Sequence, residues 1–137
     1  MAMRGETGAA TNTVHYREEE ISLARQLHRL IQPHWTPAAG HYVYDLHDRV
    51  ERDSPFQTGV YFVINYQYFM TLLGGVEAFK DAMVWLPTWQ QSRQLCRELS
   101  IADEVLIRHC FNADTIADGD ELAAVYRLIL STLSTAD

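Results

Sequence analysis

The chain has 137 residues, with 18 acidic against 11 basic side chains, a formal net charge of −7 and 47% hydrophobic residues. This length fits one domain, and a domain of this size buries roughly two thirds of its unfolded surface without needing disulfides or a metal. The composition excludes collagen-like chains, disulfide scaffolds and a wholly disordered chain. A single domain of helices and strands remains.

The distribution of charge argues against nucleic acid as a partner. Proteins that bind nucleic acid usually gather lysine and arginine into a basic stripe. Here Lys80 is the only lysine, and the arginines are scattered along the chain. The two closest groups, Arg25/Arg29 and Arg93/Arg97, have the spacing of a solvated helix face. We therefore expect no nucleic-acid partner.

Hydropathy and cysteine content bear on the cellular compartment. No run reaches the ~18 continuous apolar residues of a membrane-spanning helix, and the first 13 residues lack the apolar segment of a secretory signal. The two cysteines, Cys96 and Cys110, have no C-x-x-C spacing and fall on the apolar sides of predicted helices. The sequence thus predicts a cytoplasmic protein without a membrane partner.

The first third of the chain combines a tail, a helix and the start of a sheet. Residues 1–13 are small and polar, which predicts a flexible N-terminal tail ahead of a single α+β domain over residues 14–137. An apolar stripe predicts a helix over 16–32, with three glutamates in its first turn and Pro33 after its end. Aromatic and β-branched residues predict two antiparallel strands, 41–46 and 59–65, joined by a charged loop over 48–58.

The rest of the chain is predicted to be helical. Helices are expected over 66–73, ending at Gly74-Gly75, and over 76–85. Thr88 and Gln91 have capping-box spacing and predict a helix start. Further starts are expected near Ser100 and Thr115, and the last helix covers 120–134. The predicted fold class is α+β: a small antiparallel sheet of two or more strands packed against about five helices, mostly helical.

One group of residues could hold a metal ion. Alternate residues of a strand share a face, which aligns His41, Asp45 and His47, and imidazole and carboxylate groups are ligands for zinc or iron. A strand separates i and i+2 by ~6–7 Å, so His41 and His47 lie too far apart to share an ion unless the strand bends. A polar strand end leading into a charged loop explains the same residues. A small metal-dependent enzyme or sensor that uses these three residues is the alternative function. Because the polar strand end is the simpler explanation, we expect no cofactor.

No other catalytic pattern is present in the sequence. The chain has no Gly-x-Ser-x-Gly elbow and no phosphate-binding loop. Cys96 and His109 both fall on predicted apolar stripes, which favours core packing over a nucleophile–base pair. These observations favour a protein that is not an enzyme.

Aromatic residues are concentrated around the two predicted strands. Five of the seven tyrosines lie between Tyr42 and Tyr68, and the second strand is apolar on both faces, so either more helices or a second subunit must cover it. Tyrosine is a common anchor of protein interfaces. The leading prediction is a non-enzymatic protein-binding or accessory protein with an aromatic-rich surface. It is expected to form a homodimer whose interface includes Tyr61, Phe62 and Tyr68.

Two short segments resemble segments of small uncharacterised bacterial and phage-type proteins. They are Trp35-x-Pro37-x-x-Gly40-His41-x-x-Tyr44 and Trp85-Leu86-Pro87-Thr88-x-x-Gln91. The resemblance implies no activity and transfers no functional residue. In physical terms the first segment is a rigid entry into a strand, and the second is an entry into a helix.

Overall fold

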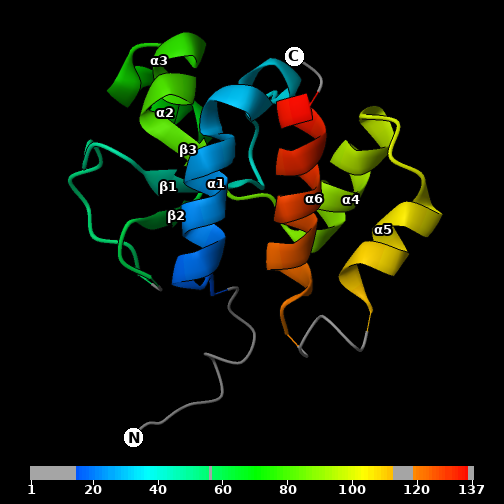
Figure 1. Ribbon diagram of the computed structural model, residues 1–137. Helices are drawn as coiled ribbons and strands as arrows, with labels where there is room; N and C mark the ends of the chain where they lie inside the picture. Colours follow the sequence, from blue (N-terminus) through cyan, green and yellow to red (C-terminus); the bar gives the residue numbers. More distant parts are fainter. Residues whose placement is uncertain (1–14, 56, 113–118, 136–137) are drawn as a thin grey trace, which may run out of the picture.

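The computed structural model describes residues 15–55, 57–112 and 119–135 (Figure 1), so the predicted tail, residues 1–13, lies outside the described residues. Across these ranges 57% of the structure is helical and 9% is strand, which confirms a mostly helical α+β fold. None of the helices in these ranges is long and apolar enough for a membrane span. In chain order the elements are α1 (Glu18–Ile31), η2 (Gln32–His34), β1 (Tyr42–Asp45), β2 (Val60–Phe62), α2 (Tyr66–Leu73), α3 (Val76–Ala82), β3 (Met83–Trp85), α4 (Trp89–Glu98), α5 (Asp103–Cys110) and α6 (Glu121–Thr135).

The sheet has three antiparallel strands in the order β2-β1-β3. Val43 of β1 lies opposite Tyr61 of β2 on one side and opposite Trp85 of β3 on the other. The predicted antiparallel pair is confirmed, although both strands are shorter than expected. The prediction of a helix over 76–85 is wrong in its last three residues, since Met83–Trp85 form β3. No glycine or proline separates α3 from β3, so the sequence carries no turn signal there.

Helices cover both faces of this sheet. On one face the α1 side contributes the ring of Tyr16, whose centroid lies 5.6 Å from that of Tyr42, and α1 crosses in front of the strands in Figure 1. On the other face Trp85 stacks on Trp35, with centroids 5.7 Å apart and ring planes 4° apart. Trp35 in turn contacts Phe79 of α3. Of the two ways to cover the sheet that the sequence left open, the chain uses its own helices.

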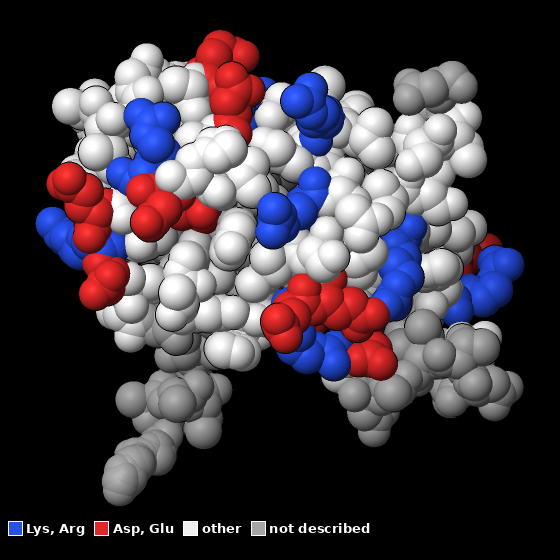
Figure 2. Space-filling model, turned by 60° about the vertical axis from the view of Figure 1, so that its left-hand side comes forward, with Lys and Arg blue, Asp and Glu red and all other residues white. Residues whose placement is uncertain are grey.

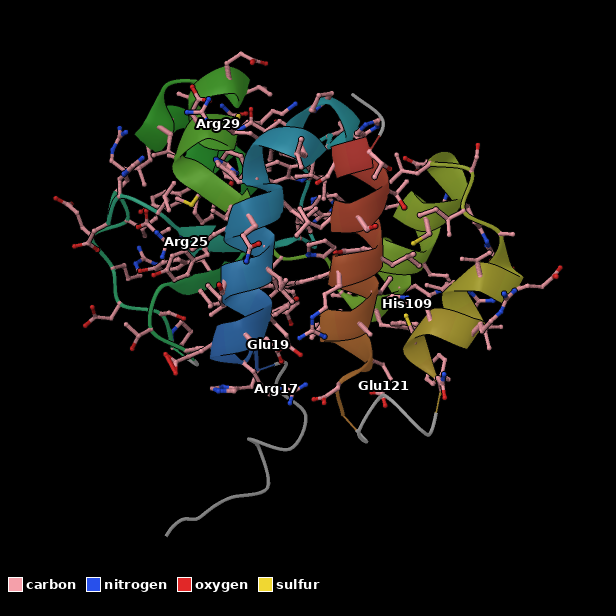
Figure 3. All side chains as sticks on the ribbon, in the orientation of Figure 1. Arg17, Glu19, Arg25, Arg29, His109 and Glu121 are labelled. Carbon is pink, nitrogen blue, oxygen red and sulfur yellow. The ribbon has the colours of Figure 1, made fainter. Side chains whose placement is uncertain are left out.

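Helices α1 and α6 run side by side in the same direction (Figure 1). Charged side chains join the N-terminal halves of the two helices: Arg17 lies 2.6 Å from Asp120, and Arg127 pairs with Glu19. Figure 3 shows Arg17 and Glu19 at the same end of the helix pair as Glu121. Such exposed ion pairs contribute little free energy each, so the buried apolar contacts between these helices carry their association.

Two buried tyrosine hydroxyls fix the connection between β3 and α4. Tyr16 Oη donates to the Leu86 carbonyl at 2.7 Å, and Tyr126 Oη donates to the Pro87 carbonyl at 2.5 Å. Tyr16 is 1% exposed and Tyr126 is fully buried. This connection, in which the Leu86 N–H also donates to the Tyr42 carbonyl of β1 at 2.9 Å, is thereby tied to both the α1 side and the α6 side of the core.

The local signals for helix ends are partly confirmed. The predicted capping box is present, with Gln91 N–H donating to Thr88 Oγ1 at 3.2 Å and Thr88 N–H donating to Gln91 Oε1 at 3.0 Å. Helix α2 has the predicted bounds and ends at Gly74, whose φ of 96° is left-handed. Helix α5 begins at Asp103, later than the expected start near Ser100. The start expected near Thr115 lies outside the described residues.

Candidate functional site

The three residues predicted to form an interface line one groove. Its volume is about 570 Å³, within the range of ligand-binding clefts. The loop that follows β1, the end of β2 and the first turn of α2 form its walls. Three of its side chains are large, apolar and exposed: Ile64 at 77%, Tyr68 at 39% and Phe62 at 37%. Its lining includes Arg52, Asp53, Tyr61, Phe62, Ile64 and Tyr68.

Hydrogen bonds hold the walls of this aromatic groove in place. Tyr61 Oη donates to the Arg52 carbonyl at 2.7 Å, which ties the loop to β2. The guanidinium carbon of Arg52 lies 5.9 Å from the centre of the Tyr68 ring, within the range of a cation–π contact. Asn65 Oδ1 accepts from the Tyr68 N–H at 3.0 Å and so begins α2 beside the groove. The groove is therefore formed without a partner.

The loop beside the groove is acidic overall. After Asp45, the last residue of β1, the loop carries three carboxylates and two guanidinium groups up to Asp53. Partial burial, followed by the charges of Asp45, Asp53 and Asp48, raises the pKa of the Tyr61 hydroxyl above its usual value. Figure 2 brings this side of the molecule forward and shows small mixed clusters of charge with uncharged surface between them.

His41, one candidate metal ligand, belongs to an aromatic stack. Its Nδ1 accepts from Trp35 Nε1–H at 3.1 Å, and its ring stacks on Trp85 with centroids 5.2 Å apart. Because Nδ1 accepts, the neutral ring carries its proton on Nε2. Burial lowers the pKa of His41 and favours this neutral form. The adjoining cleft holds about 240 Å³, which is less than most ligand pockets. The aromatic residue types of this stack are visible in the sequence, but their contact is not, because Trp85 lies more than forty residues from His41.

The other two metal candidates lie in different surroundings. Asp45 is buried, and its two carboxylate oxygens accept from the backbone N–H groups of residues 49 and 50 at 2.9 and 2.7 Å. This carboxylate therefore caps the turn that leaves β1. His47 is exposed. Within the described residues no group of three or more His, Cys, Asp or Glu side chains is arranged to hold a metal ion, and the structure does not assemble the three candidates into a site.

The two cysteines are enclosed in the helical part of the core. Cys96 and Cys110 are free and fully buried. Burial is the main cause that raises the pKa of each thiol to about 11, so both are protonated at neutral pH and neither is a ready nucleophile. The prediction that His109 lies on a buried stripe is wrong: its side chain is exposed on α5 (Figure 3).

No protein-family model matches the chain, and no curated protein or solved structure matches it significantly. The resemblance of the two tryptophan–proline segments to bacterial and phage-type proteins stays a prediction. Function must therefore be argued from the groove itself.

Proposed function

We propose that this protein is a non-enzymatic binding or accessory protein that holds another protein in the aromatic groove. One observation carries the proposal: Phe62, Ile64 and Tyr68 expose large apolar surfaces side by side on a preformed groove. Exposed apolar patches of this kind mark interaction sites on soluble proteins. The bonds from Tyr61 and Asn65 fix the groove walls beforehand, so little ordering would oppose binding.

Ile64 is the strongest single anchor, because most of its side chain faces solvent. Covering it fully would contribute roughly 1.5–3 kcal/mol to binding by apolar burial. Phe62 and Tyr68 are already about two thirds covered and add less new area. A partner that covers all three would therefore depend chiefly on Ile64.

The test compares two matched substitutions, Ile64→Glu in the groove and Ile107→Glu on α5. Ile107 is 52% exposed and does not line the groove, so its variant controls for surface charge and stability. Each tagged chain is used to capture proteins from the organism that produces it, and each captured protein is then purified and its affinity measured directly. A partner that binds wild type and Ile107→Glu, but binds Ile64→Glu at least about tenfold more weakly, supports the proposal. Equal affinity for all three chains contradicts it.

The same groove residues underlie the predicted homodimer through Tyr61, Phe62 and Tyr68. Sedimentation of the purified chain over a wide concentration range tests this prediction. A dimer that is lost in the Ile64→Glu variant and kept in Ile107→Glu identifies a second copy as the occupant. A monomer at high concentration contradicts the homodimer and leaves the groove to a different protein.

A further inference from the structure

The free edge of β2 indicates how a partner would lie in the aromatic groove. Building on the proposed function, we infer that the groove binds an extended segment of a different protein. This segment pairs with the backbone of Phe62, covers Ile64 with an apolar side chain and places a lysine or arginine beside the acidic loop.

The pairing of β1 with β2 leaves the peptide groups of Phe62 facing outward. Across the pair, Asp45 N–H donates to the Gly59 carbonyl at 2.9 Å, and Val63 N–H donates to the His41 carbonyl at 2.9 Å. Antiparallel strands bond through alternate residues, so residues 59, 61 and 63 face β1 and Phe62 faces away. Among the described residues, none bonds to the backbone N–H or carbonyl of Phe62.

The loop already covers the neighbouring outward position. Val60 N–H donates to the Gln57 carbonyl at 3.1 Å, and Ser54 Oγ donates to the Val60 carbonyl at 2.5 Å. On the other side Asn65 caps α2 and ends the extended backbone. The open edge is thus one residue long, at the point where the groove and Ile64 lie. A strand can add there through one donor and one acceptor, which is a short form of β-augmentation.

Charge favours a different, basic protein over a second copy. Two copies with a net charge of −7 each repel one another. The acidic loop borders the groove, and Asp53 lines it directly. Arg52, the other charged group in the lining, is held against the Tyr68 ring. A cationic side chain flanking an apolar one would complement this edge and steer association.

Three synthetic peptides test these features separately. The parent is acetyl-Gly-Lys-Val-Leu-Val-Lys-Gly-amide. In the acidic analogue glutamate replaces both lysines. In the third peptide, N-methyl groups on the valines and the leucine remove the central backbone donors. Affinity is measured by calorimetry for wild type, Ile64→Glu and the Ile107→Glu control, and hydrogen exchange of the Phe62 amide is followed by NMR.

We expect the parent peptide to bind wild type and Ile107→Glu and to slow exchange of the Phe62 amide. The N-methylated peptide and the Ile64→Glu variant should each weaken binding about tenfold. The acidic analogue should bind about tenfold more weakly at low salt, with a gap that shrinks as salt is added. Unchanged affinity for the N-methylated peptide, or unchanged Phe62 exchange, overturns the backbone pairing. Equal affinity for the acidic analogue overturns the charge preference.

Failure of this inference is distinguishable from failure of the proposed function. If no peptide binds up to about 1 mM, while a captured partner still distinguishes Ile64→Glu from Ile107→Glu, the extended basic segment is refuted and the proposed function stands. If the captured partner does not distinguish these variants, both are refuted.

Discussion

Removing the hydroxyl of Tyr126 tests whether two buried tyrosine hydroxyls stabilise the connection between β3 and α4. This hydroxyl donates to the Pro87 carbonyl inside the protein, and Tyr16 makes the same kind of bond to the adjacent Leu86 carbonyl. Phenylalanine at either position keeps the ring and removes only the donor. Tyr61→Phe is the matched control, because its hydroxyl bonds to the Arg52 carbonyl at the exposed edge of the groove.

The size of the effect follows from burial. A net intramolecular hydrogen bond contributes about 0.5–1.5 kcal/mol, and a buried carbonyl left without its donor costs about 1–3 kcal/mol. Tyr126 and Tyr16 are 0% and 1% exposed, so water cannot replace the lost donor unless the core opens. We expect each buried substitution to lower the free energy of unfolding by about 1–2 kcal/mol. The control should lose less than about 0.5 kcal/mol, because water can reach the Arg52 carbonyl.

Urea unfolding followed by tryptophan fluorescence measures these differences. With an m-value of about 1–3 kcal/mol/M, the expected losses lower the urea midpoint by about 0.3–2 M. The double variant should lose less than the sum, because the two accepting carbonyls are adjacent in sequence. The reasoning is refuted if Tyr126→Phe and Tyr16→Phe unfold at the same urea concentration as Tyr61→Phe.

The hydroxyls of Tyr16 and Tyr126 also determine the direction in which stability changes at alkaline pH. Burial raises the pKa of both hydroxyls above the ordinary value of 10.0. Above about pH 10 the unfolded chain therefore releases these protons while the folded chain keeps them. Stability is fully present below that pH and falls as the pH rises further. The Tyr16→Phe/Tyr126→Phe variant should show a shallower fall.

The remaining predictions concern Gly59, His41 and the two cysteines. Gly59→Ala should lose more stability than Gly74→Ala; both glycines have left-handed φ, but only at Gly59 would a Cβ lie 2.9 Å from a tyrosine ring. Equal losses in thermal unfolding contradict this. Burial lowers the pKa of His41, so as the pH falls below about 6.5 the unfolded chain takes up a proton before the folded chain does, and the free energy of unfolding decreases. His41→Gln should make this decrease smaller in urea titrations between pH 7 and 5. At pH 8 Cys96 and Cys110 should react with a thiol reagent only after denaturant is added, since burial raises both pKa values to about 11, and immediate labelling of the native chain contradicts their enclosure.

The sequence predicted those elements whose ends carry local chemistry. Helix α2 is bounded by Asn65 and Gly74, and α4 begins with the capping box of Thr88, so side chain and backbone conformation are linked within a few residues. Strand β3 has no such signal. Its three residues become a strand because β1 offers unpaired backbone groups beside them, and that neighbour is about forty residues away in sequence. Pairing with a distant strand, rather than the local conformational preference of its residues, makes this segment a strand.

The residues of the candidate site were likewise predicted only in part from the sequence. Alternation in the second strand predicted Val63 and Ile64 on opposite faces but could not say which face is covered. The strand ends at Phe62, Val63 turns into the core, and Ile64 is left 77% exposed. The sequence therefore indicated Tyr61, Phe62 and Tyr68 from their aromatic character and missed Ile64, the most exposed of the apolar groove residues. The predicted dimer rested on an uncovered sheet face, whereas the chain's own helices cover both faces. Among the described residues, one residue of the β2 edge stays open. For the proposed partner, that edge and its groove offer the backbone of Phe62 and the side chain of Ile64, which are therefore the positions that the binding experiments must change.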